Sequence, residues 1–585
     1  MLSPSRREKR RVCIVTAEFH GLFKNGGIGT ANTGLALSLA EAGHEVVVAY
    51  VDAGLVDFDE RVAEAADTIA AWAQKGVKLE FVPRNPMLRA GHEDHVAASF
   101  TVFQYLRGRG FALVFFNECG GQGYFSLLAK RAGLFPDAPR MVVVTHGANA
   151  WVLELNEQLY WSLHPISVDF LERRSVELAD DLVSPSRYLV GWMGEKGWRL
   201  PASTRIIQNA LPLKPNATQR EAAIDEIVFF GRLEARKGVE LFLSAYTALC
   251  AKRDMSRIKV TFLGKFSRIE GVHSGVYVLE RTRTWPAPPS LIAELSQEQA
   301  LSYLSRPGVL AIMPSRAENS PCVVVECIVG AVPFIATDSG GTAELIAEAD
   351  RARCLCAGAP EALVAAMDAA LDDGAPTAQL AVSQEQSREL WLDLVDETSA
   401  ASASAPMAKR NVSLCLAPGA AGNPTSDAWA AFLAQDFAEI IVVSAKAWTP
   451  PTNDPRVRLI VEPAAGVAKA RNLAASRARG PWLMFADEGE VILKGEALAG
   501  FLTAAAGLGA DVVTSPALEF THAGPPRDGW DGFLGLIPTG ANLTLAAFEN
   551  CLGEGCFLID RARFLTAGGF DAEVGAGLRD RLLLT

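Results

Sequence analysis

Two stretches in the middle of the chain carry residues whose types and spacing suit phosphate and sugar chemistry. The first reads FFGRLEARKG and places Arg232 and Lys237 five residues apart, directly after an apolar run. The second reads PSRAENSPCVVVE, again after an apolar run, and holds Glu318 and Glu326. Each apolar run predicts a buried strand that leads into a helix, and ligands of open parallel α/β sheets bind at that edge. Two cations suit a diphosphate, and two carboxylates suit sugar and ribose hydroxyls.

The second stretch also predicts how its two carboxylates are placed. Ser320 suits the N-cap of a helix and Pro321 suits its first position, so Glu318 stands just outside the helix. Glu326 then lies nearly two turns into an apolar helix, where an unpaired carboxylate is unfavourable. Ribose hydroxyls are one suitable partner for Glu326, and a purely structural role is the alternative.

A glycine-rich loop, GLFKNGGIG, follows the first predicted strand and contains Lys24, Gly26 and Gly27. Glycines let backbone N–H groups approach phosphate or sugar oxygens closely, and the helix that follows turns its positive end toward them. The glycine spacing departs from the GxGxxG pattern of dinucleotide-binding loops. A plain glycine-rich turn is the other interpretation.

Three further sets of candidate residues follow predicted strands. His146 lies in THG, and its position at a strand's carboxyl end favours a role in a site over a structural one. Asn117 and Glu118 begin the segment NECGGQGY, for which a simple polar loop is the alternative. Gly340 and Gly341 end another strand.

The order of these motifs over residues 11–395 resembles that of retaining GT-B glycosyltransferases of family 4, and KNGGIG is similar to the loop of glycogen synthases. The resemblance implies that Arg232 and Lys237 neutralise the departing diphosphate, that Glu318 contacts the transferred sugar and that Glu326 contacts the ribose. It also implies retention of anomeric configuration and a site without metal. The residues implied as catalytic are His146, Arg232, Lys237 and Glu318. The other residues implied to bind the donor are Lys24, Gly26, Gly27, Ser320, Glu326, Gly340 and Gly341.

The length of 585 residues and the alternation of strands and helices predict several α/β domains. The expected fold is α/β, with a GT-B fold of two Rossmann-like doubly wound domains and then a GT-A-like α/β domain. The expected divisions are a flexible tail (1–10), an acceptor-side domain (11–205), a donor domain with a closing helix (206–397), a linker (398–410) and a third domain (411–585). Strands of the donor domain are expected at 226–230, 258–263, 276–279, 309–313 and 333–336.

The third domain resembles the start of a family 2 GT-A glycosyltransferase through AKARNLAASRARGPWLMFADEGE and GGFDAE. Its polar chemistry departs from that pattern, because Ser444 stands where an acid is expected and the metal motif reads Asp487-Glu488-Gly489. Asp487 and Glu490 are the candidate ligands for Mg²⁺ or Mn²⁺, since hard cations accept any carboxylate. Asp580 is the candidate base. The domain is therefore expected to be degenerate or cut short.

Composition restricts the class of protein. Hydrophobic residues make up 49% and charged residues 21% of the chain, and the net charge of −12 argues against a nucleic-acid-binding protein. The ten cysteines show no zinc spacing, which favours reduced thiols in the cytoplasm. The longest apolar run is too short to span a bilayer. We therefore expect a cytoplasmic protein, with peripheral contact at the inner face of the membrane as an option.

The sequence thus predicts transfer of a sugar from a nucleotide-diphosphate sugar to a glycan or lipid-linked acceptor, in the synthesis of surface polysaccharide or glycoconjugate. The resemblance implies that the GT-B half needs no cofactor, whereas the third domain could use Mg or Mn. Two alternatives remain open at this point: a sugar-nucleotide epimerase with the GT-B fold, and a non-catalytic sugar-nucleotide-binding or scaffolding protein. Release of free nucleoside diphosphate separates these classes.

Overall fold

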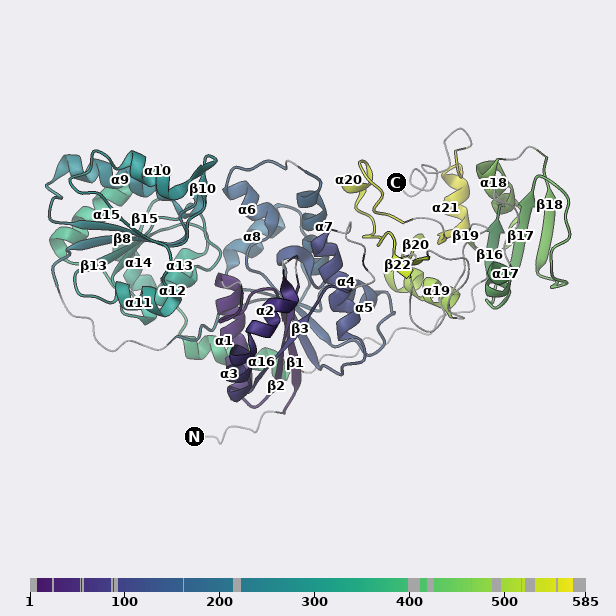
Figure 1. The fold of residues 1–585 in the computed structure, drawn as a ribbon, viewed down its shortest axis with the longest axis horizontal. Coiled ribbons are helices and arrows are strands. Elements are labelled where there is room, and N and C mark those ends of the chain that lie inside the picture. Colours follow the sequence, from purple (N-terminus) through teal and green to yellow (C-terminus); the bar gives the residue numbers. More distant parts are fainter. Residues whose placement is uncertain are drawn as a thin grey trace.

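The computed structural model describes residues 8–571 except 24–25, 53, 55–56, 86–87, 89–92, 161, 214–221, 398–410, 418–425, 464–465, 487–495, 517, 521–531 and 554–555. The described residues form three α/β domains in a row, with the domain that begins the chain in the middle (Figure 1). The predicted linker, 398–410, lies outside the described residues. No described helix combines the length and the apolar character needed to cross a bilayer.

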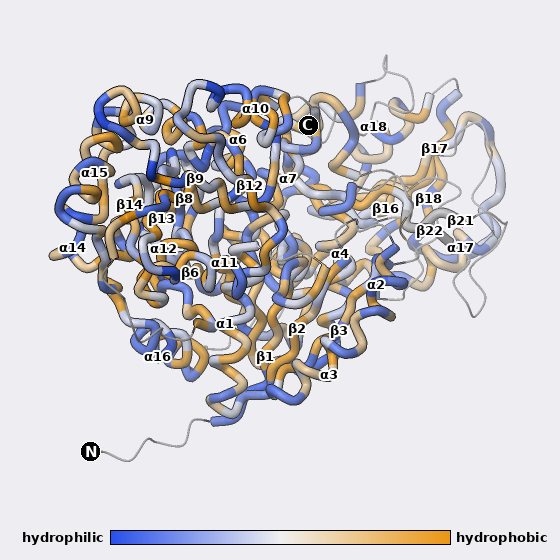
Figure 2. The backbone as a smooth tube through the Cα atoms, turned by 60° about the vertical axis from the view of Figure 1, so that its left-hand side comes forward, coloured by the Kyte–Doolittle hydropathy of each residue, from blue (hydrophilic) through white to orange (hydrophobic). Residues whose placement is uncertain are grey.

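The first domain is built on a parallel sheet of order β3-β2-β1-β4-β5-β6-β7. Its inner strands are buried on both faces, as their nearly continuous apolar sequences predict, whereas the edge strands β3 and β7 are only partly buried; Figure 2 shows the hydrophobic trace along β1 and β2. The strands are β1 (Arg11–Thr16), β2 (Glu45–Val51), β3 (Val77–Val82), β4 (Leu113–Asn117), β5 (Arg140–Val144), β6 (Asp181–Ser184) and β7 (Thr204–Ile206). The helices are α1 (Gly27–Glu41), α2 (Phe58–Glu64), α3 (Ala66–Gln74), α4 (Asp94–Leu106), the short 3₁₀ helix η1 (Cys119–Gly121), α5 (Tyr124–Arg131), α6 (Asn149–Leu155), α7 (His164–Leu178) and α8 (Arg187–Glu195).

The second domain repeats this design with a parallel sheet of order β12-β9-β8-β13-β14-β15, beside which β10 and β11 form a small hairpin. The strands are β8 (Glu226–Phe230), β9 (Lys259–Leu263), β10 (Arg268–Ile269), β11 (Val272–His273), β12 (Ser290–Ile292), β13 (Val309–Met313), β14 (Phe334–Thr337) and β15 (Leu355–Cys356). The helices are η2 (Ala235–Lys237), α9 (Val239–Lys252), α10 (Ser274–Arg281), α11 (Gln297–Leu304), α12 (Cys322–Val329), α13 (Thr342–Leu345), α14 (Glu348–Cys354) and α15 (Pro360–Asp373), and the chain then continues into α16 (Gln384–Asp396).

One predicted strand of this domain is wrong. Residues 276–279 lie in the helix α10, where Ser274, Tyr277 and Val278 are buried while Val276 and Leu279 are exposed. That spacing of three and four residues is helical, and packing against the sheet outweighs the strand preference of the β-branched residues.

The closing helix α16 lies on the first domain, although the sequence assigns it to the second. Trp391 of α16 belongs to the first domain's core, and its indole N–H donates to the carbonyl of Gln208 at 3.0 Å. Glu397, just after the helix, binds Arg205 through two hydrogen bonds of 2.6 Å. Arg10 donates to the carbonyl of Asp396 at 2.7 Å, so the predicted N-terminal tail is anchored by residue 10. The chain therefore crosses between the two domains twice.

The third domain has a mixed sheet of order β18-β17-β16-β19-β23-β20, in which β23 runs antiparallel to both neighbours. Four of its strands are β16 (Val412–Leu416), β17 (Glu439–Ser444), β19 (Trp482–Ala486) and β20 (Val512–Thr514). The remaining strands are β18 (Val457–Val461), β21 (Leu518–Phe520), β22 (Gly532–Leu534) and β23 (Phe557–Asp560). The helices are α17 (Ser426–Leu433), α18 (Val467–Arg477), α19 (Ala497–Leu508), α20 (Leu543–Ala546) and α21 (Arg561–Thr566).

The third domain is packed against the first. The buried hydroxyl of Tyr124 on α5 donates to the carbonyl of Thr539 at 2.5 Å, and Ile537 lies within the first domain's hydrophobic core. Leu163 and Ile166, at the start of α7, pack against a small apolar cluster around α20. The two domains therefore share buried apolar surface and are held together by more than the chain between them.

Candidate active site

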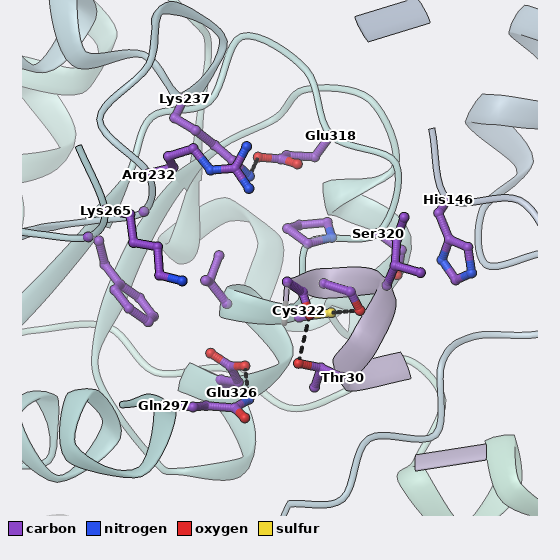
Figure 3. A pocket seen from close by; sticks show the side chains of 18 of the residues that line it. Thr30, His146, Arg232, Lys237, Lys265, Gln297, Glu318, Ser320, Cys322 and Glu326 are labelled. Carbon is purple, nitrogen blue, oxygen red and sulfur yellow. Dashed lines mark hydrogen bonds and ion pairs between the residues drawn. The ribbon is translucent and has the colours of Figure 1, made fainter. Parts of the chain in front are cut away.

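A cleft of about 890 Å³ separates the first and second domains. Its walls come from loops that follow strands of both sheets, so the carboxyl edges of the two sheets face each other across it. Figure 3 shows labelled residues of both domains around this space. Among the predicted site residues, those that line the cleft are Gly26, Gly27, His146, Arg232, Lys237, Glu318, Ser320 and Glu326.

Glu318 is held in the cleft wall by cations. It follows β13, and Lys237 follows the adjacent parallel strand β8, so strand order brings the two side chains together. One carboxylate oxygen binds the Lys237 ammonium and accepts from the Ser315 hydroxyl at 2.7 Å, while the other accepts from Arg236 at 3.1 Å. Burial raises the pKa of Glu318, but these charges and hydrogen bonds outweigh burial and lower the pKa to about 2. Glu318 is therefore a carboxylate at neutral pH.

Arg232 has a different environment from Lys237. Its side chain is 55% exposed, and its ion pair with Glu234 is long, at 3.4 Å. Figure 3 shows Arg232, Lys237 and Lys265 along one side of the cleft. This side can therefore receive an anion, with Arg232 able to turn toward it.

The spacing of the sequence does not single out Arg236, yet the structure places it in the cleft wall. It lies between Glu318 and Glu234, and its guanidinium stands 5.6 Å from the ring centre of Trp151 in the first domain. An arginine so placed fixes Glu318 and links the second domain to the first.

Glu326 lies on α12 and is buried, as the sequence predicts. One of its carboxylate oxygens accepts a hydrogen bond from the side-chain amide of Gln297 at the start of α11. Burial raises the pKa of Glu326, and this hydrogen bond lowers it in part. The expected N-cap is shifted by one residue, because α12 begins at Cys322 with Pro321 at its N-cap. Ser320 therefore lines the cleft without capping the helix.

The glycine-rich loop reaches the cleft from the first domain. Gly26 is the N-cap of α1, and a Cβ atom there would lie 2.9 Å from a carboxylate oxygen of Glu18. Gly27 is in contact with Cys322 across the cleft, with its carbonyl 3.8 Å from the sulfur. Lys24 lies outside the described residues.

His146 lines the cleft, and Glu118 lies behind it. The backbone N–H groups of His146 and Gly147 donate to one carboxylate oxygen of Glu118 at 2.6 and 2.5 Å. Burial raises the pKa of Glu118 to about 7, and it lowers the pKa of the His146 imidazole to about 4. His146 is therefore neutral at pH 7. Asn117 is also buried and donates to the carbonyl of Val15 at 3.2 Å, so Asn117 and Glu118 support the loops rather than line the cleft.

Gly340 and Gly341 are not among the residues that line the cleft, and their contact with the donor stays a prediction. A Cβ atom on Gly340, whose φ is +61°, would lie 2.1 Å from the carbonyl oxygen of Glu318. A Cβ atom on Gly341 would lie 2.0 Å from the carbonyl oxygen of Asn319. The glycines are needed for this close backbone approach, through which the N–H of Gly341 donates to the carbonyl of Glu318 at 2.8 Å.

Asn319 connects the two walls of the cleft. Its amide nitrogen donates to the carbonyl of His146 at 3.1 Å, and its side-chain oxygen accepts from the hydroxyl of Ser186 at 2.5 Å. The sequence does not predict that Asn319 bridges two domains, because an asparagine next to a candidate carboxylate has no distinctive pattern.

Comparison with protein-family models agrees with this geometry. Residues 26–210 match a model described as "Glycosyl transferase 4-like domain", and residues 225–373 match one described as "Glycosyl transferases group 1". These segments are glycosyltransferase domains. With two parallel α/β domains facing each other across the site, residues 8–397 form a GT-B glycosyltransferase unit, which we call the GT-B unit.

Solved structures give matches of low sequence identity. Sucrose-phosphate synthase from Thermosynechococcus elongatus is 15% identical with a TM-score of 0.46, and the match covers 66% of this chain and 95% of that one. The catalytic domain of starch synthase IV from Arabidopsis thaliana, bound to ADP and acarbose, is 12% identical with a TM-score of 0.44 and the same coverage. The Anabaena protein HepE in complex with UDP-glucose is 13% identical with a TM-score of 0.43, covering 66% and 97%. A search of curated proteins gave no match.

The third domain uses its predicted motifs for packing in the part that is described. Asn472 of α18 forms two hydrogen bonds of 2.8 Å with the backbone of Phe570, and the guanidinium of Arg471 stands 5.2 Å from the ring centre of Phe570. The two sequence motifs therefore meet in space. Asp487, Glu490 and Asp580 lie outside the described residues.

Proposed function

We propose that the GT-B unit transfers a sugar from a nucleotide-diphosphate sugar to a glycan or lipid-linked acceptor with retention. The observation that carries this proposal is the exposed Arg232 beside Lys237 in a cleft that also holds Glu318, with the loop of Gly26 and Gly27 opposite. A diphosphate placed along Arg232 and Lys237 leaves its sugar between Glu318 and His146.

The charges of the cleft suit departure of a diphosphate. Arg232 and Lys237 stabilise the negative charge that grows on the leaving group, and they are positioned before the reaction begins. Lys237 exchanges part of its ion pair with Glu318 for the phosphate oxygens. Glu318, ionised at neutral pH, then accepts hydrogen bonds from hydroxyls of the transferred sugar.

We assign Glu326 and Gln297 to the nucleoside end of the donor. The hydrogen bond between them fixes the carboxylate, whose second oxygen accepts from a ribose hydroxyl. This arrangement gives a buried carboxylate a second polar partner when the donor binds.

We infer retention from the family resemblance and from the ion pairs of the Glu318 carboxylate. Glu318 is bound by Lys237 and Arg236, which makes it a poor nucleophile. The leaving phosphate then accepts the proton of the attacking hydroxyl on the same face of the sugar. The two cations take the place of a metal ion at the diphosphate, so the transfer proceeds without Mg²⁺ or Mn²⁺.

We place this transfer in the synthesis of surface polysaccharide or glycoconjugate, on the cytoplasmic side of the membrane. We further propose that residues 411–585 are a GT-A-like domain that supports the GT-B unit and does not catalyse transfer. The motif residues Asn472 and Arg471, which pack against Phe570, support this assignment.

A nucleotide-sugar screen tests the proposed function. Donors are first ranked by thermal shift of the full-length protein, because a ligand that binds the folded state raises its apparent stability. The best donor is then incubated with acceptor sugars, and nucleoside diphosphate release and the anomeric configuration of the product are measured by NMR. Lys237→Ala is expected to lower release by about 100- to 1000-fold, whereas Arg268→Ala, on the exposed hairpin, keeps it. An epimerised nucleotide sugar, an inverted product or binding without turnover would reject the proposal.

A further inference from the structure

Two histidines and a glutamate come together in the first domain, outside the cleft between the domains. Glu93 precedes α4, His95 is the second residue of α4, and His164 is the first residue of α7. One potential ligand atom from each lies within 4.8 Å of the other two. The residues come from two separate helices, so the group is a product of the tertiary structure.

The orientation of His95 is the decisive feature of this cluster. Its side chain is only 7% exposed, and its Nε2 atom lies 2.8 Å from the hydroxyl of Ser167. Its Nδ1 atom has no hydrogen-bond partner among the described residues and lies 3.6 Å from a carboxylate oxygen of Glu93, too far for a hydrogen bond. An imidazole that donates from one nitrogen to a neighbouring oxygen presents the lone pair of the other, as metal-bound histidines do.

Glu93 and His164 complete the arrangement on the solvent side. The same oxygen of Glu93 lies 2.5 Å from Nδ1 of His164, and the two imidazole rings stand edge to face with centroids 4.9 Å apart. The side chain of Glu93 is 41% exposed and that of His164 is 50% exposed. Their exposure gives an ion access from solvent and allows both side chains to adjust around it.

We propose that Glu93, His95 and His164 bind a divalent transition-metal ion, and that the preferred ion is Zn²⁺. Two imidazole nitrogens and a carboxylate oxygen are a donor set that zinc accepts, with water in the remaining position. Zinc–nitrogen bonds are about 2.0–2.1 Å long, so the three ligand atoms need only draw together around the ion.

The bound ion would tie the start of α4 to the start of α7. Leu163 and Ile166, next to His164, pack against the third domain. The metal therefore stabilises the surface on which the third domain sits, at a site separate from the proposed diphosphate position. This role is structural and does not depend on the proposed sugar transfer.

The test measures zinc binding by the full-length chain without a polyhistidine tag. The protein is stripped with EDTA and titrated with Zn²⁺, and bound metal is counted by equilibrium dialysis with mass spectrometry. The unchanged sequence is expected to bind one more zinc ion than His164→Gln or Glu93→Gln, and zinc is expected to raise its melting temperature more. His273→Gln, which removes an exposed histidine of the second domain, is the matched control and keeps the additional ion.

A variant at Ser167 distinguishes a designed metal site from a chance cluster. Ser167→Ala leaves all three ligands in place but removes the partner of His95, and loss of such a partner weakens metal binding by about 10- to 100-fold. Equal zinc stoichiometry and affinity in the unchanged protein and in His164→Gln would overturn the proposal. Because His95→Gln alters a buried residue, the exposed positions Glu93 and His164 decide the outcome if that variant does not fold.

Discussion

Two buried glutamates, Glu318 in the cleft wall of the second domain and Glu118 behind the cleft in the first, have opposite electrostatic environments. On the second domain, Glu318 is bound by Lys237 and Arg236, and its pKa falls to about 2. On the first domain, burial raises the pKa of Glu118 to about 7, although two backbone N–H groups donate to it. The charges of Lys and Arg side chains lower the pKa of a buried carboxyl by more than burial raises it. Hydrogen bonds from backbone N–H groups lower the pKa by less than burial raises it.

We call the side of Glu318, which is ionised at neutral pH, the charged wall, and the side of Glu118, whose carboxyl keeps its proton up to about pH 7, the neutral wall. Glu318 remains ionised and lines the cleft, where it can meet a ligand. Glu118 lies behind the loop that carries His146 and fixes that loop through its backbone. Burial of an acidic residue near a site is therefore not enough to assign it a role in the reaction. The charges and hydrogen-bond donors around its carboxyl determine whether it is ionised.

The charged wall gives the largest expected effect. Arg232→Ala and Lys237→Ala should each lower turnover by about 100- to 1000-fold, since each removes a positioned charge from the transition state. The melting temperature of Arg232→Ala should stay unchanged, because this side chain is exposed. Steady-state kinetics with the best donor and thermal unfolding measure the two quantities, with Arg268→Ala as control. Near-normal turnover in both folded variants would remove the charged wall from the mechanism.

The neutral wall is expected to change stability with pH. Between about pH 4.5 and 7 the unfolded chain loses the Glu118 proton while the folded protein keeps it, so stability falls as the pH rises. Glu118→Gln keeps the hydrogen bonds to His146 and Gly147 and should remove this part of the decline, on the order of 3 kcal/mol for a shift of this size. Glu298→Gln, at an exposed helix position, is the control.

Denaturant unfolding at several pH values measures that slope. Glu318 has the opposite sign, because its lowered pKa gives stability that is present above about pH 4.5 and is lost as the pH falls toward 2. An identical pH slope in Glu118→Gln and the unchanged protein would contradict the assignment of a protonated Glu118.

The two carboxylates of the second domain sharpen the comparison further. Glu318→Gln should lower turnover, and Glu326→Gln should mainly weaken nucleotide binding, each by about tenfold, as expected for a lost hydrogen bond to a charged group. Calorimetric affinities for the nucleoside diphosphate and kcat separate the two effects. If Glu326→Gln lowers the melting temperature and leaves the affinity unchanged, its bond with Gln297 is structural.

The smallest effect is expected in the third domain. Asp487→Ala in the full-length chain should leave sugar transfer unchanged, with or without Mg²⁺ or Mn²⁺, because the domain retains few of the carboxylates that hold a donor-bound metal. The intact chain is used because truncation after Glu397 would remove the contact of Tyr124 with Thr539. Metal-dependent transfer that is lost in Asp487→Ala would establish a second active site.

The sequence was sufficient to predict the parts of the site that follow strands. Arg232, Lys237 and Glu318 each come after a buried apolar run, and β8 and β13 are adjacent parallel strands, so the three residues meet at one sheet edge. Gln297 and Asn319 gave no such signal. Their partners, Glu326 and the carbonyl of His146, lie on separate elements, and for Asn319 on another domain.

What the sequence determined by itself is local: apolar runs that form buried strands, glycines where backbones meet, and charges placed just beyond strand ends. Tertiary structure decided which neighbour each element found. It turned residues 276–279 into a helix, laid α16 on the first domain, placed Gly340 and Gly341 outside the lining of the cleft and joined Glu93 and His95 to His164. The physical reason is that burial and charge pairing depend on contacts between residues far apart in the chain. A local sequence pattern does not specify those contacts.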